Sequence, residues 1–343
     1  MPERIGILET DTEKQFYMNT AQTKPQYVKT AKEILAIGVI ETPMLVENLL
    51  QKKGMATLTG SSDGGKSFLG LFIASILCGD KDKIFGYKIN RNTGSVIVVC
   101  TEDSAEDICV RLTKFSKKHK IDEEKLRFIF DTGNLASKLK SELKRKPADL
   151  VIMDTFGDLY SGNLNDSITV RKFLTPYKEL AEEFKCLFLF NHHIGKGKEH
   201  NATPSKNDVL GSQAIESACR TVLMLRKKDD GKRTLTVVKG NHIAEEYKNR
   251  GIVLTFDINT GFESTGDIIT YSECNQEAQV TEDMVNEILE LYPQLKSYQK
   301  VADAMRKLGF KIDKNKVGKL WKEHKPSVQP PTENDGRTEA DAA

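Results

Sequence analysis

Short apolar runs alternate with amphipathic segments through the middle of the chain. Apolar runs rich in β-branched and aromatic residues predict strands at 55–60, 95–101, 126–131, 148–155, 186–193, 219–227, 234–240 and 251–257. Helical spacing of apolar residues predicts helices at 66–78, 105–117, 135–145 and 169–183. Apolar strands that alternate with helices are typical of a mostly parallel sheet covered on both faces, so we predict an α/β fold. The last three strands follow one another without helices, which predicts an antiparallel extension at that edge.

The two ends of the chain show different patterns. Residues 1–40 are polar without a clear period and are interpreted as an N-terminal arm that precedes a core at 41–262. Residues 263–280 are interpreted as a linker, and residues 326–343, which are acidic and rich in proline, as a disordered tail. Between them, residues 281–325 predict a small domain of three helices, which Thr281, Ser297 and Asp313 begin and in which Gly309 ends the second.

Composition narrows the class of protein. The chain has 343 residues, with 51 Lys and Arg against 49 Asp and Glu, and 38% hydrophobic residues, which excludes collagen-like and wholly disordered proteins. No run approaches the ~18 consecutive apolar residues of a membrane span, and the N-terminus lacks the apolar stretch of a secretory signal. The six cysteines are scattered without a CxxC pair, so we expect buried free thiols in a cytoplasmic protein rather than zinc or disulfides.

A glycine-rich loop lies between the first predicted strand and the first predicted helix. Residues 60–67 read GSSDGGKS and match the pattern GxxxxGK[ST]. In such a loop backbone N–H groups turn toward phosphates, the Lys lies between the β- and γ-phosphates, and the Ser hydroxyl reaches Mg²⁺. We expect nucleotide binding by Gly60, Ser61, Ser62, Asp63, Gly64, Gly65, Lys66, Ser67 and Phe68, with Asp63 pointing to solvent.

Acidic residues end two further strands. Asp154 ends the run LVIMD, and an acid at the carboxyl end of a parallel strand faces the ligand crevice. We expect Ser67 and Asp154 to hold Mg²⁺. Glu102 ends the strand VIVVCTED, where a general base can orient water toward the γ-phosphate. Asp103 is the competing candidate for that role, or a cap for the next helix.

Five segments occur in the order seen in RecA-fold, RepA-like ATPases. They read GMATLTGSSDGGKS, VIVVCTEDSAEDICVRL, ADLVIMDTFGDLY, FLFNHHIGKG and GSQAIESACRTVLML. Over residues 40–262 the chain resembles this family of AAA-type P-loop ATPases, which includes replicative helicases of plasmids, phages and other mobile elements and is related to the DnaB ring helicases. The resemblance implies a RecA-like core, ATP and Mg²⁺ as cofactors, and a hexamer or filament that acts on DNA during replication.

The resemblance also implies roles for residues beyond the phosphate loop. His192 and His193 match the position that senses the γ-phosphate, and we favour His193; a buried imidazole bonded to backbone is the structural alternative. Residues 156–168 and 194–211 match the loops that touch DNA in the family, and Lys196, Lys198 and Lys206 lie in the second. A long lysine-bearing loop without a pattern suits contact with a single-stranded DNA backbone, although a merely solvated loop has the same composition.

In the family, a Lys and Arg pair on a late strand completes the site of a neighbouring subunit. Lys239 matches the lysine, but Asn241 stands where an arginine is common, and Leu210 replaces a second arginine. Arg220 or Arg226 are alternatives, and the sequence does not choose between them. Because a charge supplied by a neighbour can raise the rate by several powers of ten, these departures put vigorous hydrolysis in doubt.

The C-terminal helical domain is basic. Lys314, Lys316 and Lys319 lie mostly off the apolar face of its third helix, and two short helices around LGFKI fit a helix-turn-helix or winged-helix module. Lysines of this kind contact phosphates more than bases. The alternative is a domain that mediates contact between subunits.

Two functions fit these features best. The first is a Mg²⁺-dependent, ring-forming ATPase motor on DNA, a RepA-like helicase, with Lys66, Glu102, His192, His193 and Lys239 as its catalytic residues. The alternative is a nucleotide-switched loader or regulator that binds DNA without unwinding it. A small-molecule kinase fits less well, because it explains neither Glu102 nor the paired histidines.

Overall fold

The computed structural model describes residues 28–195, 204–209, 213–228, 230–248, 250–270, 282–310, 312 and 314–324. The chain divides into two compact units, Met1–Pro43 and Met44–Ala343. In the first unit, helix α2 (Ala31–Leu35) begins at Thr30, whose side chain and Glu33 cap each other. The large apolar side chains of this segment are exposed, namely Val28, Ile34, Leu35, Ile37, Val39 and Ile40.

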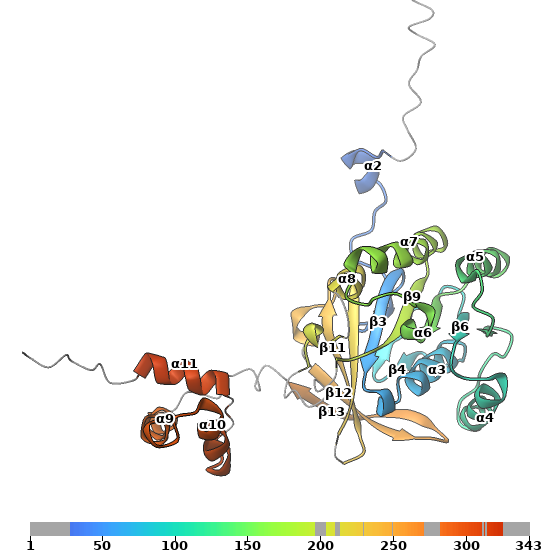
Figure 1. The fold of residues 1–343 in the computed structure, drawn as a ribbon. Helices are drawn as coiled ribbons and strands as arrows, with labels where there is room; N and C mark the ends of the chain where they lie inside the picture. Colours follow the sequence, from blue (N-terminus) through green and yellow to red (C-terminus); the bar gives the residue numbers. More distant parts are fainter. Residues whose placement is uncertain are drawn as a thin grey trace, which may run out of the picture. The chain divides into compact units, whose positions relative to one another are not determined.

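The second unit is built on a nine-stranded sheet with the order β13-β12-β11-β10-β3-β9-β8-β6-β7 (Figure 1). Neighbours from β10 to β7 are parallel, and neighbours from β10 to β13 are antiparallel. The predicted parallel sheet and its antiparallel extension are therefore confirmed. The strands are β3 (Gly54–Gly60), β6 (Val96–Cys100), β7 (Leu126–Ile129), β8 (Leu150–Asp154), β9 (Leu187–His193), β10 (Thr221–Lys227), β11 (Arg233–Gly240), β12 (Arg250–Asp257) and β13 (Gly261–Thr270).

Helices cover both faces of this sheet, because successive side chains of each strand point to opposite faces. In β6, Val96 and Val98 enter one apolar core while Ile97 and Val99 enter the other. The first core contains α3 (Lys66–Leu77) and α4 (Ala105–Ser116). The second contains α5 (Leu135–Arg145), α6 (Phe156–Leu159), α7 (Ser167–Phe184) and α8 (Gln213–Ala218).

Short elements that the sequence pattern did not predict complete the unit. Two small hairpins pair β1 (Met44–Val46) with β2 (Leu50–Gln51) and β4 (Lys83–Ile84) with β5 (Tyr87–Lys88). Single turns of 3₁₀ helix form η1 (Ser62–Gly64), η2 (Lys206–Asp208) and η3 (Glu245–Tyr247). These elements are too short to leave a hydrophobic period in the sequence.

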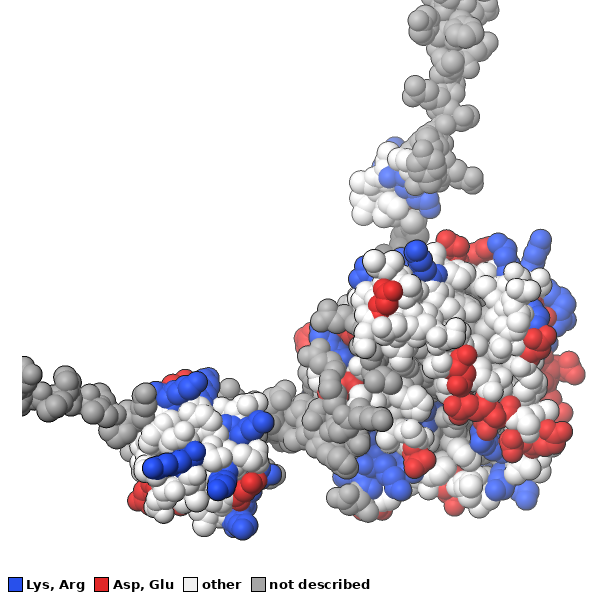
Figure 2. All heavy atoms as spheres, in the orientation of Figure 1, with Lys and Arg blue, Asp and Glu red and all other residues white. Residues whose placement is uncertain are grey.

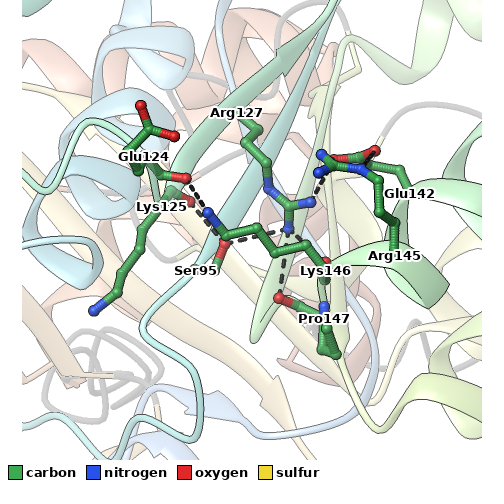
Figure 3. Close-up of polar contacts among 8 residues, drawn as sticks. All are labelled: Ser95, Glu124, Lys125, Arg127, Glu142, Arg145, Lys146 and Pro147. Carbon is green, nitrogen blue, oxygen red and sulfur yellow. Dashed lines mark hydrogen bonds and ion pairs between the residues drawn. The ribbon is translucent and has the colours of Figure 1, made fainter.

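A polar cluster fixes the edge strand β7 to its neighbours (Figure 3). The guanidinium of Arg127 donates to Glu142 of α5, to the Lys146 carbonyl oxygen at 2.8 Å and to Ser95 Oγ at 3.2 Å. Arg145 donates to the same Glu142 carboxylate at 2.6 Å. Hydrogen bonds from Arg145 and Arg127 lower the pKa of Glu142, so the carboxylate stays charged and ties β7 to α5.

Residues 263–270 correct the predicted linker. They form most of β13 and pair with β12. Their side chains are largely exposed, so they show no alternation of apolar and polar residues. Backbone pairing to β12, rather than burial, holds this strand, and a hydrophobic pattern does not reveal such a strand. Residues 271–281, the rest of the predicted linker, lie outside the described residues together with Thr281.

The C-terminal helices form their own apolar core. They are α9 (Glu282–Leu295), α10 (Tyr298–Lys307) and α11 (Lys314–His324). Ser297 caps α10, Gly309 follows it with φ +91°, and Tyr292 stacks against Tyr298 and Trp321 at 4.8 and 4.4 Å between ring centroids. The described residues from 282 to 324 contain these helices and no strand. The wing of a winged-helix module stays a prediction, and Asp313 lies outside the described residues.

Two expectations about the chain's chemistry can be compared with the structure. Among the described residues, no helix has the length and apolar character needed to cross a membrane. Cys78, Cys100, Cys186 and Cys219 are buried free thiols, and burial raises the pKa of each to about 12. Cys109 on α4 is free and exposed, whereas Cys274 lies outside the described residues.

Candidate nucleotide site

The glycine-rich loop has the geometry that its sequence predicts. It runs from the end of β3 through η1 into α3, and Gly65 has φ +93°, in the left-handed region that favours glycine. A Cβ on Gly60 would lie 2.5 Å from the Leu225 carbonyl oxygen of β10, so only glycine fits there. These two glycines allow the chain to turn from a buried strand directly into a buried helix.

Lys66 lies inside this loop. Its side chain is buried, and Nζ donates to the Ser61 carbonyl oxygen at 2.8 Å. Burial lowers the pKa of Lys66, and the carboxylates of Asp154, Glu102 and Asp63 oppose that shift. The ammonium group therefore lies at the start of α3, where the charges of three carboxylates act on it. A bound triphosphate would add further negative charge and so stabilise this buried cation.

Ser67 and Asp154 meet although 87 positions separate them. Ser67 Oγ donates to Asp154 Oδ1 at 3.2 Å. Both lie at the carboxyl edge of the sheet, because β3 and β8 run parallel on either side of β9. Burial raises the pKa of Asp154, while Asn191, Ser67 and Lys66 act in the opposite direction. A hydroxyl and a carboxylate are oxygen donors that suit Mg²⁺, and an ion would stabilise the charged form of this buried acid.

Glu102 lies beyond the end of β6, beside Asp158 of α6. Partial desolvation of its carboxyl group, then the charges of Asp158 and Asp154, raise the pKa of Glu102. Asp158 stays ionised, because hydrogen bonds from Thr101 Oγ1 at 2.7 Å and Thr155 Oγ1 at 2.8 Å lower its pKa. Asp158 was not predicted as a site residue. Its place in the motif DTFGDLY, four residues after Asp154, is the sequence signal that could have found it.

Asp103, the competing acid, has other partners. Its carboxylate forms a bidentate ion pair with the guanidinium of Arg111, in which Arg111 Nη2 lies 2.7 Å from Asp103 Oδ1. Arg111 also lies 4.5 Å from the ring centroid of Phe68. The cap of α4 is Ser104, which exchanges hydrogen bonds with Asp107. Ser104 rather than Asp103 therefore caps α4, and of the two acids Glu102 and Asp103 it is the charge of Glu102 that acts on Lys66. The role of Glu102 as the base stays a prediction.

The two histidines at the end of β9 point in opposite directions. His192 is 1% exposed and packs edge-to-face against Phe156 at 5.1 Å between centroids. His193 is half-buried and pairs in register with Gly60 of β3. Burial and Lys66 lower the pKa of His193, and Asp158 opposes this. His193 thus faces the phosphate loop, whereas His192 belongs to the apolar core.

Arg233 of β11 contacts the loop from the antiparallel half of the sheet. It is buried, and its Nε donates to the Gly64 carbonyl oxygen at 3.0 Å. Its guanidinium also lies 5.3 Å from the ring centroid of Phe256. Arg233 was not predicted as a site residue, because the pattern of β11 indicates a strand but not which of its polar residues contacts the loop.

The basic residues expected to act on a neighbour differ in their partners. Lys239 Nζ lies 2.9 Å from Glu216 Oε1, and Arg226 lies 3.0 Å from Asp208 Oδ2 in a nearly buried pair. Both of these cations are therefore engaged within their own chain. Arg220 and Asn241 are exposed and linked by a backbone hydrogen bond of 3.1 Å. Leu210 lies outside the described residues.

The predicted DNA-binding lysines are only partly described. Lys196 and Lys198 lie outside the described residues, and Lys206 is exposed, 3.8 Å from Glu216. Lys314 and Lys319 are exposed on α11, and Lys316 is half-buried. Figure 2 shows several basic residues around the C-terminal helices. Contact with DNA stays a prediction for all six lysines.

The surface over the site is acidic. Figure 2 shows Asp and Glu gathered between α6 and the start of α4, where Glu102, Glu106, Asp107 and Asp158 are exposed. No group of three or more His, Cys, Asp or Glu residues within the described ranges is placed to hold a metal ion. A cation here would therefore need the phosphates of a nucleotide as additional ligands, as Mg²⁺ at such loops does.

Comparison with known proteins agrees with this geometry. The model of a family described as AAA domain, AAA_25, matches residues 28–199, which include the phosphate loop, Glu102, Asp154 and both histidines. No match was found among the curated proteins. With half of its length matched and the site residues gathered at one edge of the sheet, the chain belongs to this AAA domain family of P-loop ATPases.

Proposed function

We propose that the protein is a Mg²⁺-dependent, ring-forming motor that hydrolyses ATP on DNA, in the manner of a RepA-like replicative helicase. The observation that carries the proposal is the cluster at the carboxyl edge of the sheet. There Lys66 is buried in the loop, Ser67 and Asp154 are 3.2 Å apart, and Glu102 and His193 face the same place. The order of the motifs along the chain, which resembles that of RepA-like ATPases, supports the finer assignment.

Each residue of this cluster has a distinct task. Lys66 neutralises charge on the β- and γ-phosphates, and the N–H groups of residues 61–67 hold the phosphates in place. Ser67 and Asp154 would hold Mg²⁺, which would supply positive charge that stabilises the phosphates. Glu102 orients a water molecule for attack in line with the γ-phosphate. Partial desolvation and then the charge of Asp158 raise the pKa of Glu102, so that this base gains affinity for the proton.

His193 connects the site to the second loop. Its backbone belongs to β9, which pairs with β3 up to Gly60, and its pKa responds to Lys66. Loss of the γ-phosphate changes the charge beside Lys66, and residues 194–211 follow His193 directly. Residues in this loop would bind single-stranded DNA, which is how the proposed motor couples hydrolysis to movement.

Replacement of Lys66 tests the ATPase assignment. In the Lys66→Ala variant we expect ATP hydrolysis, with and without single-stranded DNA, to fall below detection, because the phosphates lose their buried cation. Glu102→Gln is the matched variant: it should bind ATP but hydrolyse it about 10²–10⁴-fold more slowly, the usual contribution of a general base. Turnover is measured as phosphate release with Mg²⁺ and with EDTA. Undiminished turnover in Lys66→Ala would refute the assignment.

A nucleotide-switched loader or regulator is the second candidate. It is favoured by Lys239 and Arg226, which are bound to Glu216 and Asp208 within their own chain and so are less available to a neighbour. A strand-displacement assay separates the candidates, because a helicase unwinds a forked duplex while a loader binds DNA only when ATP is present. Light scattering with and without ATP and single-stranded DNA tests assembly, and a strict monomer in every condition would contradict a ring.

A further inference from the structure

A buried asparagine lies beside one of the two candidate magnesium ligands. Asn191 of β9 is 0% exposed, and among the described residues neither its Nδ2 nor its Oδ1 has a hydrogen-bond partner. An amide left unsatisfied in the core costs stability, whereas an apolar side chain of similar size at the same place would not. A buried polar group of this kind therefore calls for an explanation other than packing.

The register of the sheet places Asn191 next to Asp154. Strands β8 and β9 are parallel, and Met153 pairs with Phe190 at the end of their ladder. Asp154 and Asn191 come next on the two strands, so they are neighbours across the sheet. On its other side, Asn191 pairs with Leu58 of β3. The asparagine thus lies between the strand that leads into the phosphate loop and the strand that ends in Asp154.

The side chain of Asn191 points to the face of the sheet that α3 covers. Leu189, two positions earlier, enters the apolar core on that face, whereas Phe190 enters the opposite core. A Cβ on Gly70 of α3 would lie 3.4 Å from Asn191 Nδ2. Gly70 follows Ser67 by three positions and so lies on the same side of the helix. The amide therefore reaches the side of α3 that carries the other candidate ligand.

The amide acts on the carboxylate of Asp154. Burial raises the pKa of Asp154, and Asn191 opposes this shift more than Ser67 or Lys66 does. The effect has the sign of an N–H group directed at the carboxylate, which favours its charged form, although the two groups do not form a hydrogen bond of ordinary length. Ser67 Oγ donates to Asp154 Oδ1 at 3.2 Å, and one long hydrogen bond by itself leaves a carboxylate free to turn.

We infer that Asn191 is a positioning residue, which holds the Asp154 carboxylate in the orientation that magnesium binding needs. This inference rests on the proposed function, because it concerns the Mg²⁺ that would accompany ATP. Polar groups behind a metal ligand fix its direction, and their loss weakens metal binding roughly 10–100-fold. Since Asn191 is fully buried, it acts through Asp154 and does not itself contact a ligand. Local departures from a well-satisfied core are expected at functional sites, which accounts for an asparagine inside an apolar strand.

Asn191→Leu tests the inference, because leucine has a similar size and no polar group. Binding of a fluorescent ADP analogue to the full-length protein is followed while Mg²⁺ is titrated. We expect the Mg²⁺ concentration at half-saturation to rise about tenfold or more. Affinity for the analogue in EDTA should not change, and stability toward urea should be equal or higher, because the unsatisfied amide is gone. A purely structural role predicts the reverse, with lower stability and an unchanged Mg²⁺ requirement.

Two further variants keep the test decisive. Asn191→Ala fits the available space even if leucine does not. It should lose stability through the cavity that it leaves, yet raise the Mg²⁺ requirement as Asn191→Leu does. Thr236→Val is the matched control, since Thr236 of β11 is 1% exposed and its Oγ1 likewise has no hydrogen-bond partner within the described part of the chain. This control should leave the Mg²⁺ requirement unchanged.

The outcomes separate this inference from the proposed function. If the wild type requires Mg²⁺ and both variants of Asn191 keep the wild-type requirement, the inference alone is overturned. An equal rise in Thr236→Val would also overturn it, because any change in the buried polar groups would then have the same effect. If the wild type binds the analogue equally well with Mg²⁺ and with EDTA, the magnesium site of the proposed function fails, and the inference fails with it.

Discussion

The parallel and antiparallel halves of the sheet both reach the phosphate loop, but they supply different things. Parallel strands β3, β8, β6 and β9 end at one edge and bring the charged groups there: Lys66, Asp154, Glu102 and His193. The antiparallel half brings the buried Arg233, which bonds to the Gly64 carbonyl oxygen, and the apolar ring of Phe262 beside Gly65. The parallel half therefore supplies the charged groups of the site, and the antiparallel half packs against the phosphate loop.

The contact between β3 and β10 joins these two halves, and breaking it should have the largest effect. In Gly60→Ala, the new Cβ would lie 2.5 Å from the Leu225 carbonyl oxygen, so strand or loop must shift. We expect the free energy of unfolding to fall by about 1–3 kcal/mol and ATP binding to become undetectable. Urea denaturation and a fluorescent ATP analogue measure the two quantities.

Gly64→Ala is the matched control for stability. Its Cβ would lie 3.3 Å from the Ser61 hydroxyl oxygen, which can rotate away, and 3.8 Å from the Leu225 carbonyl oxygen. Equal losses of stability in Gly60→Ala and Gly64→Ala would show that β3 and β10 are not closely packed at this point. That result would contradict the view that this contact joins the two halves of the sheet.

Replacement of Arg233 tests the supporting half by itself. Arg233→Met keeps much of the apolar length of the side chain but removes the hydrogen bond to Gly64. Because hydrogen bonds to charged groups contribute about 1.5–3 kcal/mol, we expect ATP affinity to fall about tenfold or more while Glu102 and Asp154 stay in place. Lys227→Met is the control, since Lys227 pairs with Arg233 across the ladder but is exposed. Similar losses in both variants would indicate a general effect of charge.

The smallest expected effect is a shift in pH dependence. Partial desolvation and the charge of Asp158 raise the pKa of Glu102, so protonation inactivates this base at a higher pH than it would without these two effects. Asp158→Asn removes a negative charge, lowers the pKa of Glu102, and should move the acidic limb of the ATPase pH profile to lower pH. Glu106→Gln removes an exposed acid of the same surface and should leave the limb in place. A shift of the acidic limb to higher pH in Asp158→Asn would contradict the proposed effect of Asp158 on Glu102.

The charged groups of the parallel half could be read from the sequence, and the supporting residues could not. Lys66 follows the glycine-rich loop at the start of a predicted helix, whereas Asp154 and Glu102 stand at the ends of apolar runs, and the carboxyl ends of parallel strands share one edge. Arg233 and Asp158 carry no such signal, because their contacts depend on which strand lies beside the loop and on a helix of only four residues, α6. Sequence analysis favoured His193 over His192, and the structure adds a physical reason, because His192 is buried against Phe156 whereas the charge of Lys66 acts on half-buried His193.

The elements of the fold likewise fall into those that the sequence pattern predicted and those that it did not. The period of apolar residues predicted the buried strands and the long helices closely, since burial on both faces leaves a strong pattern. It failed for residues 263–270, which are held by pairing to β12 with exposed side chains. Residues 28–40, which were interpreted as part of a polar arm, carry several large apolar side chains that are exposed in the structure.

The continuous ladder between β3 and β9 has a mechanical consequence. Every residue from Gly54 to Gly60 has a partner in β9, and the Ile194 N–H donates to the Gly60 carbonyl oxygen at 3.3 Å. A shift of the phosphate loop would therefore move the start of the segment after His193 as well, unless the hydrogen bond between Ile194 and Gly60 breaks.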